Sequence, residues 1–301
     1  MSPRFSSMRP RSAWRRKGLS GGWFVAPAGA VLSLFVLYPM VRTLWISFHD
    51  WSLSGQRTAW VGLSNYRELF HDDRFRHAAK VTFIYTAVAV VGQTALGLAL
   101  GFRLRRTSRF TTVLRSAYFF PTIAALSTMG LVWRFLLDPQ IGLANAWIGS
   151  AGFVAPEWLR STTWALPAVI AVGIWKNVGF TMLVIVSAMQ EVPESLDEAA
   201  QLDGANSWQR FRHVIVPSIR PALLFVSVIN TIASLQMFDL VFAMTRGGPL
   251  FKTETLVTYM YQRGFQEFRF GYAAAISWSL FLVIMIFAVV ELRVFRDDDV
   301  D

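Results

Sequence analysis

The chain contains no cysteine, which excludes disulfide bonds, thiolate metal sites and cysteine nucleophiles. Charge is scarce as well, since 16% of its 301 residues are charged where a soluble domain carries about a quarter. The four histidines show no metal-ligand spacing: His49, His71, His77 and His213. No G-x-x-x-x-G-K-[ST] phosphate-binding loop occurs either, so ATP hydrolysis would have to come from another polypeptide. We therefore expect a non-enzymatic protein with no metal or cofactor of its own.

Apolar residues are abundant. Hydrophobic residues make up 54% of the sequence, with 12 Trp and 25 Phe, and the mean hydropathy is +0.41. A net charge of +10 could indicate nucleic acid, but the basic residues flank apolar runs instead of alternating along a soluble face. Basic edges beside apolar runs are typical of membrane proteins. We expect a lipid bilayer as partner and no nucleic acid.

Apolar stretches long enough to cross a bilayer, which takes about 20 residues, recur along the chain. The first apolar run, Trp23 to Val41, exceeds a usual signal peptide and lacks a cleavage site, so it predicts a retained helix. The sequence predicts an all-α membrane protein with a six-helix transmembrane domain at 23–294, between a basic tail at 1–22 and a short tail at 295–301. The predicted spans are 23–46, 81–102, 113–137, 164–189, 221–243 and 272–294.

The distribution of basic residues predicts the orientation of these spans. Residues 1–22 are strongly basic, and the 103–112 turn carries arginines without any acid, whereas the alternate loops balance base with acid. By the positive-inside rule, both termini and the 190–220 loop lie in the cytoplasm of a multi-pass protein of the cell inner membrane.

The 190–220 loop is long and polar for a connection between two membrane helices. Pro193 suits a first helical position, the acids that follow it suit a helix N-terminus, and Gly204 suits the left-handed residue that ends a helix. Asn206 or Ser207 would cap a second helix, and Pro217 would stop it. The loop therefore predicts two short amphipathic helices joined at a glycine.

The second helix carries Trp208 and Phe211 at helical spacing, with Arg210 and Arg212 beside them. Aromatic side chains with a charged rim are typical of a protein interface. The same helix could lie on a lipid surface, where the two arginines would also serve. The residues by themselves leave both interpretations open.

The string Glu198-Ala199-Ala200, then Gly204, then Val214-Ile215-Val216-Pro217 resembles the EAA loop of ABC-importer permeases. This resemblance implies a coupling helix seated in a cleft of a cytoplasmic ATP-binding subunit, where Glu198 makes polar contacts and Gly204 permits the turn. The residues implied in this coupling are Glu198, Ala199, Ala200, Asp203, Gly204, Trp208, Phe211 and Pro217.

Shorter strings are similar to the carbohydrate-uptake branch of that family, the maltose and glycerol-3-phosphate permeases. They are Val61-Gly62-Leu63-Ser64-Asn65-Tyr66, Phe119-Phe120-Pro121, Ile174-Trp175-Lys176, and Thr245-Arg246-Gly247-Gly248-Pro249 followed by Thr253. The resemblance implies half of a translocation pathway for a sugar or sugar-like solute. It also implies an ATPase dimer that binds ATP and Mg²⁺, a second related permease and an extracytoplasmic solute-binding protein as partners.

Polar side chains within spans usually face a cavity or another helix. Asn230, Gln236 and Asp239 in the fifth span, and Trp133 in the third, are the candidates for contact with solute. Trp133 could equally be an interfacial anchor, and Asp239 could pair with a basic neighbour. An ion-coupled secondary transporter is the alternative function, but it would require a mid-membrane carboxylate and leaves the long loop unexplained.

Overall fold

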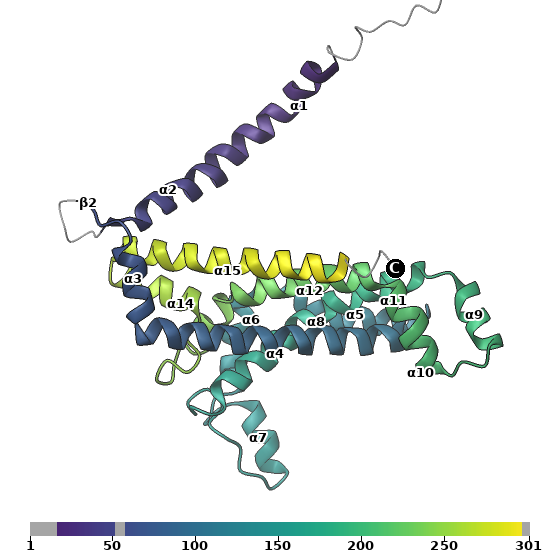
Figure 1. The fold of residues 1–301 in the computed structure, drawn as a ribbon. Coiled ribbons are helices and arrows are strands. Elements are labelled where there is room, and N and C mark those ends of the chain that lie inside the picture. Colours follow the sequence, from purple (N-terminus) through teal and green to yellow (C-terminus); the bar gives the residue numbers. More distant parts are fainter. Residues whose placement is uncertain (1–16, 52–57, 297–301) are drawn as a thin grey trace, which may run out of the picture.

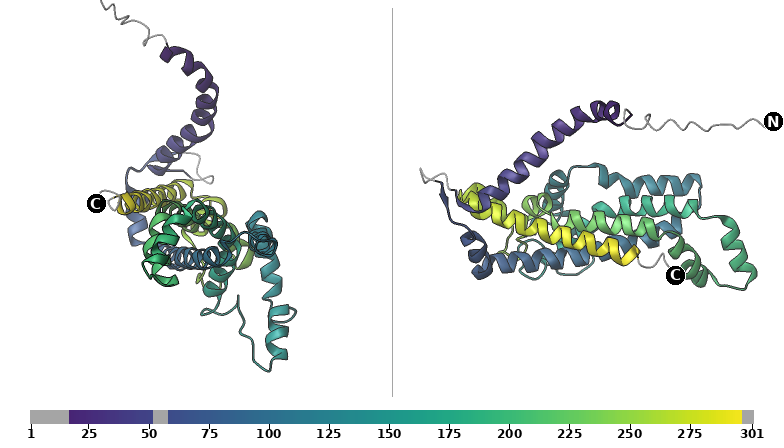
Figure 2. Two further views of the ribbon diagram at one scale, coloured as in Figure 1. Left: turned by 90° about the vertical axis from the view of Figure 1, so that its right-hand side faces the viewer. Right: turned by 45° about the horizontal axis from the view of Figure 1, so that its top comes forward.

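The computed structural model describes residues 17–51 and 58–296, with side chains for 25–51 and 58–293. Of the predicted tails, residues 1–16 of the tail at 1–22 and residues 297–301 of the tail at 295–301 lie outside the described residues. Long helices run side by side in one bundle, and an N-terminal arm leaves it at the end where α3 lies (Figures 1 and 2). Within the described residues, four helices are long and apolar enough to span a membrane, or six if each of two bent pairs is one span.

The N-terminal arm consists of α1 (Lys17–Leu32), a π-helical turn η1 (Ser33–Leu37) and α2 (Tyr38–Ser47). The π-turn precedes Pro39, which has no N–H to donate to the carbonyl of Phe35, and Tyr38 N–H instead bonds the carbonyl of Ser33. The most apolar stretch of the arm, within Val25–Ser47, is 0% buried. The described side chains of the arm are mostly exposed, as on a membrane helix, and its α2 part packs against the bundle at α15.

A short hairpin, β1 (His49–Asp50) paired antiparallel with β2 (Ala59–Trp60), follows the arm, and α3 (Ser64–His71) comes next. Asn65 fastens α3 to the end of the arm, because its Nδ2 donates to the carbonyls of Ser47 at 2.8 Å and His49 at 3.1 Å. The sequence string that contains Asn65 thus serves a structural junction.

The centre of the bundle is the pair α4 (Asp73–Leu104) and α8 (Ala165–Glu191). A Cβ built on Gly97 would lie 2.6 Å from Thr181 Cγ2, and one on Gly101 would lie 2.9 Å from Ile185 Cγ2. Such contact distances leave room only for glycine. Without a hydrophobic drive between helices in lipid, small residues at the contact allow close backbone packing.

The predicted third span, 113–137, is wrong as a single helix. It divides into α5 (Arg109–Ile123) and α6 (Leu126–Leu136), which are bent by 100° at two extended alanines. The freed carbonyl of Thr122 accepts a hydrogen bond from Lys176 Nζ at 3.3 Å, and Thr122 Oγ1 donates to the Lys176 carbonyl at 2.9 Å. The break is therefore stabilised by α8, whose polar contribution the apolar pattern of 113–137 does not reveal.

The predicted fifth span, 221–243, also divides. Helix α12 (Arg220–Leu235) ends before Gln236, and α13 (Asp239–Met244) begins after a break. Within the break, the carbonyl of Met237 accepts a hydrogen bond from Thr255 Oγ1 at 2.8 Å. The remaining elements are α7 (Leu143–Ser150), which projects from the side of the bundle, α14 (Leu256–Tyr261), η3 (Gln262–Gln266) and α15 (Phe270–Arg296).

A polar network closes the end of the bundle where α4, α14 and η3 meet. The carboxylate of Asp72 accepts hydrogen bonds from Tyr259 and, at 2.5 Å, from Tyr272, and Arg263 lies 3.6 Å away. Beside it, Arg74 donates twice, at 2.7 and 2.8 Å, to Glu254, whose side chain is fully buried. A fully paired network of this kind fixes the relative positions of the helices that supply it.

Asp72 should make stability depend on pH. Burial raises its pKa, but the hydrogen bonds from Tyr259, Tyr272 and the backbone N–H groups of Phe75 and Arg74 outweigh that effect and leave the pKa below its usual value. A carboxyl with a depressed pKa in the folded state stabilises the fold above its unfolded pKa. That stabilisation is lost as the pH falls through the folded pKa.

We therefore expect Asp72→Asn to lower the free energy of unfolding by about 1.5–3 kcal/mol at pH 7. Thermal unfolding in detergent measures the effect, and the difference from wild type should shrink in acid, where wild type loses the same charge. Asp73→Asn is the matched control, because the Asp73 side chain is 94% exposed. Equal shifts for the two variants, or a difference that does not change with pH, would contradict this assignment.

Candidate coupling site and solute pathway

Residues 190–220 form a helical hairpin at the end of the bundle where α4 and α15 also end (Figure 1). We call it the 190–220 hairpin. Its parts are α9 (Glu194–Leu202), α10 (Ser207–Arg210), a π-helical turn η2 (Phe211–Ile215) and α11 (Val216–Ser218).

The first helix of the hairpin agrees with the sequence prediction except at its start. Pro193 is predicted to occupy the first turn of this helix, but it lies just before the helix. Its ψ of 130° is extended, like that of the chain leaving α8. Glu194 and Asp197 lie in the first turn, where a negative charge is stabilised by the helix dipole. Gly204 has φ +82°, which confirms the predicted left-handed end.

The second helix begins at the predicted cap but does not end where predicted. Asn206 Oδ1 accepts from the Gln209 N–H at 2.9 Å, and Gln209 Oε1 accepts from the Asn206 N–H at 2.8 Å, a complete capping box. The sequence predicts that Pro217 stops this helix, and the helix ends one residue later, at Ser218. Because Pro217 cannot donate a hydrogen bond to the His213 carbonyl, the helix widens into η2, and the chain bends by 71° only after Ser218.

An ion pair holds the two halves of the hairpin together. Arg210 Nη1 lies 3.1 Å from Asp197 Oδ2, and the two side chains are 17% and 28% exposed. A pair so far withdrawn from solvent is screened less than a surface pair. The sequence predicts Arg210 either in the charged rim of a protein interface or on a lipid surface, and the structure pairs it with Asp197 within the hairpin itself.

The predicted aromatic anchor separates into two roles. The Phe211 ring packs inward, 4.8 Å from the ring of Phe102 on α4, within an apolar cluster that includes Ile185 and Ile215. Trp208 stacks on Phe211 at 5.4 Å and is 64% exposed. Phe211 therefore fastens the hairpin to the membrane helices, and because it is only half-buried, its predicted contact with an ATPase stays a prediction.

The other residues implied in coupling lie mostly on the surface. Ala200 is half-buried, and the exposed ones are Glu198, Ala199, Asp203, Gly204 and Pro217. Leu202, next to them, is 90% exposed although it is apolar. The hairpin thus presents small, acidic and apolar side chains to its surroundings.

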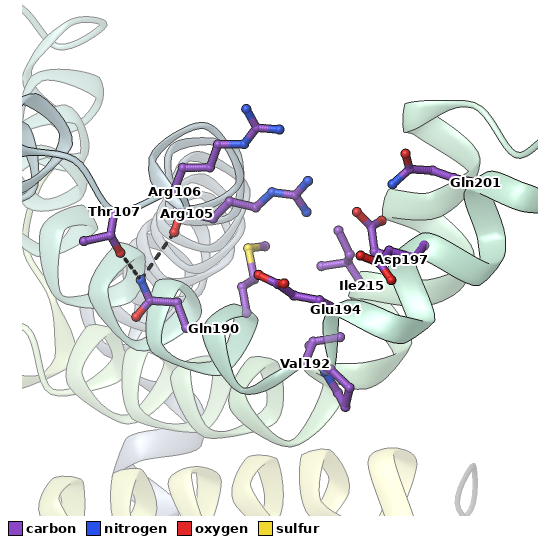
Figure 3. A pocket seen from close by; sticks show the side chains of 12 residues that line it. Arg105, Arg106, Thr107, Gln190, Val192, Glu194, Asp197, Gln201 and Ile215 are labelled. Atoms are coloured by element: carbon purple, nitrogen blue, oxygen red, sulfur yellow. Dashed lines mark hydrogen bonds between the residues drawn. The ribbon is translucent and has the colours of Figure 1, made fainter.

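A pocket of about 680 Å³ separates the hairpin from the turn between α4 and α5 (Figure 3). Arg105 and Arg106 reach into it from the turn, opposite Glu194 and Asp197 of α9. Gln190 positions the basic turn, since its Nε2 donates to the Arg105 carbonyl and to Thr107 Oγ1, each at 3.3 Å. In the sequence these arginines indicate only which side of the membrane the turn lies on. Their charge is opposite to that of the acids of α9, and this was a signal that the two loops face each other.

The four candidate pathway residues lie in different environments. Asn230 is buried, and its Nδ2 donates to Thr181 Oγ1 at 3.1 Å, so its amide joins α12 to α8. Gln236 and Asp239 are exposed at the α12–α13 break. Trp133 is half-buried on α6, with its ring 5.3 Å from that of Trp175.

Helices α6 and α13 bring two of these candidates together. A Cβ on Gly130 of α6 would lie 2.7 Å from the Cβ of Ala243 on α13, so the two helices are in close contact. Trp133 and Asp239 therefore belong to one helix pair built from the two broken spans. Asn230 belongs to the bundle core instead.

Residues 93–295 match the family described as binding-protein-dependent transport system inner membrane component. The chain belongs to this family. It is thus a multi-pass inner-membrane permease subunit, the non-catalytic part of an ABC importer, and the match favours this function over an ion-coupled secondary transporter. The family resemblance carried by the EAA-like loop is confirmed.

Relatives and solved structures cover nearly the whole chain. The chain is 32% identical to the sulfoquinovosyl glycerol transport system permease protein of Agrobacterium fabrum, over 91% of this chain and 90% of that one. It is 31% identical to the lactose transport system permease protein of Rhizobium radiobacter, over 95% and 98%. A crystal structure of a bacterial ABC transporter involved in the import of the acidic polysaccharide alginate shares its fold, with a TM-score of 0.82, 21% identity and coverage of 94% and 98%.

The Asp197–Arg210 pair should control how firmly the hairpin is closed. Asp197→Asn leaves Arg210 withdrawn from solvent without a carboxylate, so we expect local opening to become about fivefold more frequent, which corresponds to ~1 kcal/mol. Limited trypsin digestion of the chain in detergent, followed at Arg210 and Arg212, measures this opening. The exposed Asp203→Asn is the control, and equal cleavage rates in both variants would argue against the pair.

Proposed function

We propose that this subunit forms half of the translocation pathway for a sugar or a sugar-like solute. The proposal rests on the family to which the chain belongs. The exposed position of the EAA-like residues on the 190–220 hairpin agrees with it. Relatives that cover nine-tenths of the chain are named for lactose and sulfoquinovosyl glycerol transport, which supports a glycoside as cargo.

The outward surface of the 190–220 hairpin is the proposed seat of the ATP-binding subunits, which would bind ATP and Mg²⁺. The basic 103–109 turn lies at the same end of the bundle, so the positive-inside rule supports a cytoplasmic position for this end and for both termini. The solute-binding protein would dock at the opposite end, and a second, related permease would complete the pathway.

The packing of the hairpin suggests how force would reach the pathway. Phe211 and Ile215 contact α4 and α8, and α11 leads through one bend into α12. Helix α12 in turn ends at the break that carries Gln236. Movement of the hairpin by the ATPase would therefore be passed to α8 and α12, and along α12 to the break.

Purification with the partner subunits tests the proposal. Lactose, sulfoquinovosyl glycerol and alginate oligosaccharides are added with the solute-binding protein to the complex in proteoliposomes. We expect at least one sugar to stimulate ATP hydrolysis and to accumulate inside the vesicles. Uptake by this chain alone, driven by an ion gradient without ATP, would rule the importer function out.

Gly204 offers a sharper test of the hairpin. No atom lies within 4 Å of a Cβ built there, so a larger side chain meets only the backbone strain of φ +82°, about 1–2 kcal/mol for an L-residue. We expect Gly204→Val to remain in the membrane while uptake falls about fivefold or more relative to ATP hydrolysis. Gly204→Asn, which tolerates this conformation, is the control. Normal coupled uptake by the valine variant would contradict a docking role for this turn.

A further inference from the structure

Aromatic side chains form a continuous stripe on the outside of the bundle, from the start of α15 to the α12–α13 break. The rings of Phe238, Phe242 and Tyr261 pack against one another, with centroids 5.1, 5.2 and 5.4 Å apart. Phe265 follows, 5.4 Å from Tyr261. Phe270 continues the row, 6.1 Å from Phe265. We call Phe238, Phe242, Tyr261 and Phe265 the aromatic stripe.

The stripe lies on an accessible surface. On α13, Leu240 and Val241 are fully buried, whereas Phe238 and Phe242 are half-buried on the other side of the helix. Exposure increases away from the break, and Phe265 is 61% exposed. The stripe therefore presents ring surfaces to whatever lies beside the bundle at this level.

Polar groups accompany the stripe at the break. Gln236 and Asp239 are exposed there, and within the described residues the Asp239 side chain makes no hydrogen bond or ion pair. The Arg246 guanidinium carbon lies 5.9 Å from the Phe242 ring. Charged side chains within spans face cavities more often than lipid, so this surface does not fit a lipid-facing helix side.

The outer side of α15 provides a contrast within the same chain. Its exposed side chains between Leu282 and Val290 are apolar, mostly aliphatic, and carry no charge. That composition is what a bilayer core favours. Rings combined with hydroxyl-binding groups instead match a glycoside, which has apolar C–H faces and polar edges.

We propose that the aromatic stripe is a stacking track for pyranose rings, along which the sugar moves between the outer end of the subunit and the α12–α13 break. This inference rests on the proposed function, since it requires a glycoside as cargo. The rings stack on sugar faces without selecting one sugar, and Gln236 and Asp239 bind hydroxyl groups where the track ends.

Two leucine variants, Phe242→Leu and Tyr261→Leu, remove a ring but keep an apolar side chain of similar bulk. We expect uptake of the sugar that most stimulates ATP hydrolysis, among lactose, sulfoquinovosyl glycerol and alginate oligosaccharides, to fall about three- to tenfold per ring at saturating binding protein. Tyr261→Phe keeps the ring and should restore uptake. Co-purification of the second permease should stay unchanged.

Phe287→Leu is the matched control, because Phe287 is also a partly exposed ring, on the outer side of α15. Uptake at the wild-type rate in the double variant Phe242→Leu/Tyr261→Leu would overturn the proposal. Equal loss in Phe287→Leu would reassign the stripe to lipid contact, and loss of the second permease would reassign it to subunit contact. A wild-type complex that takes up none of these sugars would refute the proposed function itself, a result separate from all of these.

Discussion

The contact of Phe211 with α4 and α8 joins the exposed hairpin to the membrane helices. A short polar loop has little apolar surface to bury against the membrane helices. The Phe211 ring provides this surface, because it packs against Phe102 and the cluster of Ile185 and Ile215. Full burial of a phenylalanine side chain contributes about 1.5–3 kcal/mol, and the half-buried Phe211 contributes part of that. The ion pair between Asp197 and Arg210 joins α9 to the second helix, so both helices of the hairpin are attached to the bundle through Phe211.

The same bundle combines rigid and broken helices. Helices α4 and α8 are continuous and meet through Gly97 and Gly101, and they supply a stiff centre. Both helices of the α6–α13 pair begin at a break, and each break is held by a side chain from elsewhere, Lys176 in one case and Thr255 in the other. Irregular backbone at membrane depth requires such partners, because lipid offers no hydrogen bonds. The exposed polar candidates Gln236 and Asp239 lie at one of these breaks.

The sequence was sufficient to predict the elements whose signals are local. Apolar length predicted the four continuous spans. Asn206, Gly204 and the acids of α9 predicted the hairpin, because caps and left-handed turns depend on neighbours in the chain. The helix breaks could not be predicted in this way. They depend on Lys176 and Thr255, which come from distant segments and donate hydrogen bonds to the backbone carbonyls freed at the breaks. Hydropathy measures only how apolar a segment is, so it cannot predict where a backbone carbonyl will find such a donor. The inward direction of Phe211 depended likewise on Phe102, more than 100 positions away.

The π-helical turn before Pro217 has a consequence for the phase of the hairpin. A π-turn inserts one residue into a helix, and each residue turns an α-helix by about 100°. The side chains before the turn are therefore rotated by about 100° about the helix axis relative to those after it. The direction in which Trp208 points relative to α12 therefore depends on the π-turn, which lies directly before the missing N–H of Pro217. A single-residue deletion between Phe211 and Val216 would reset that phase while leaving every membrane helix at its present length.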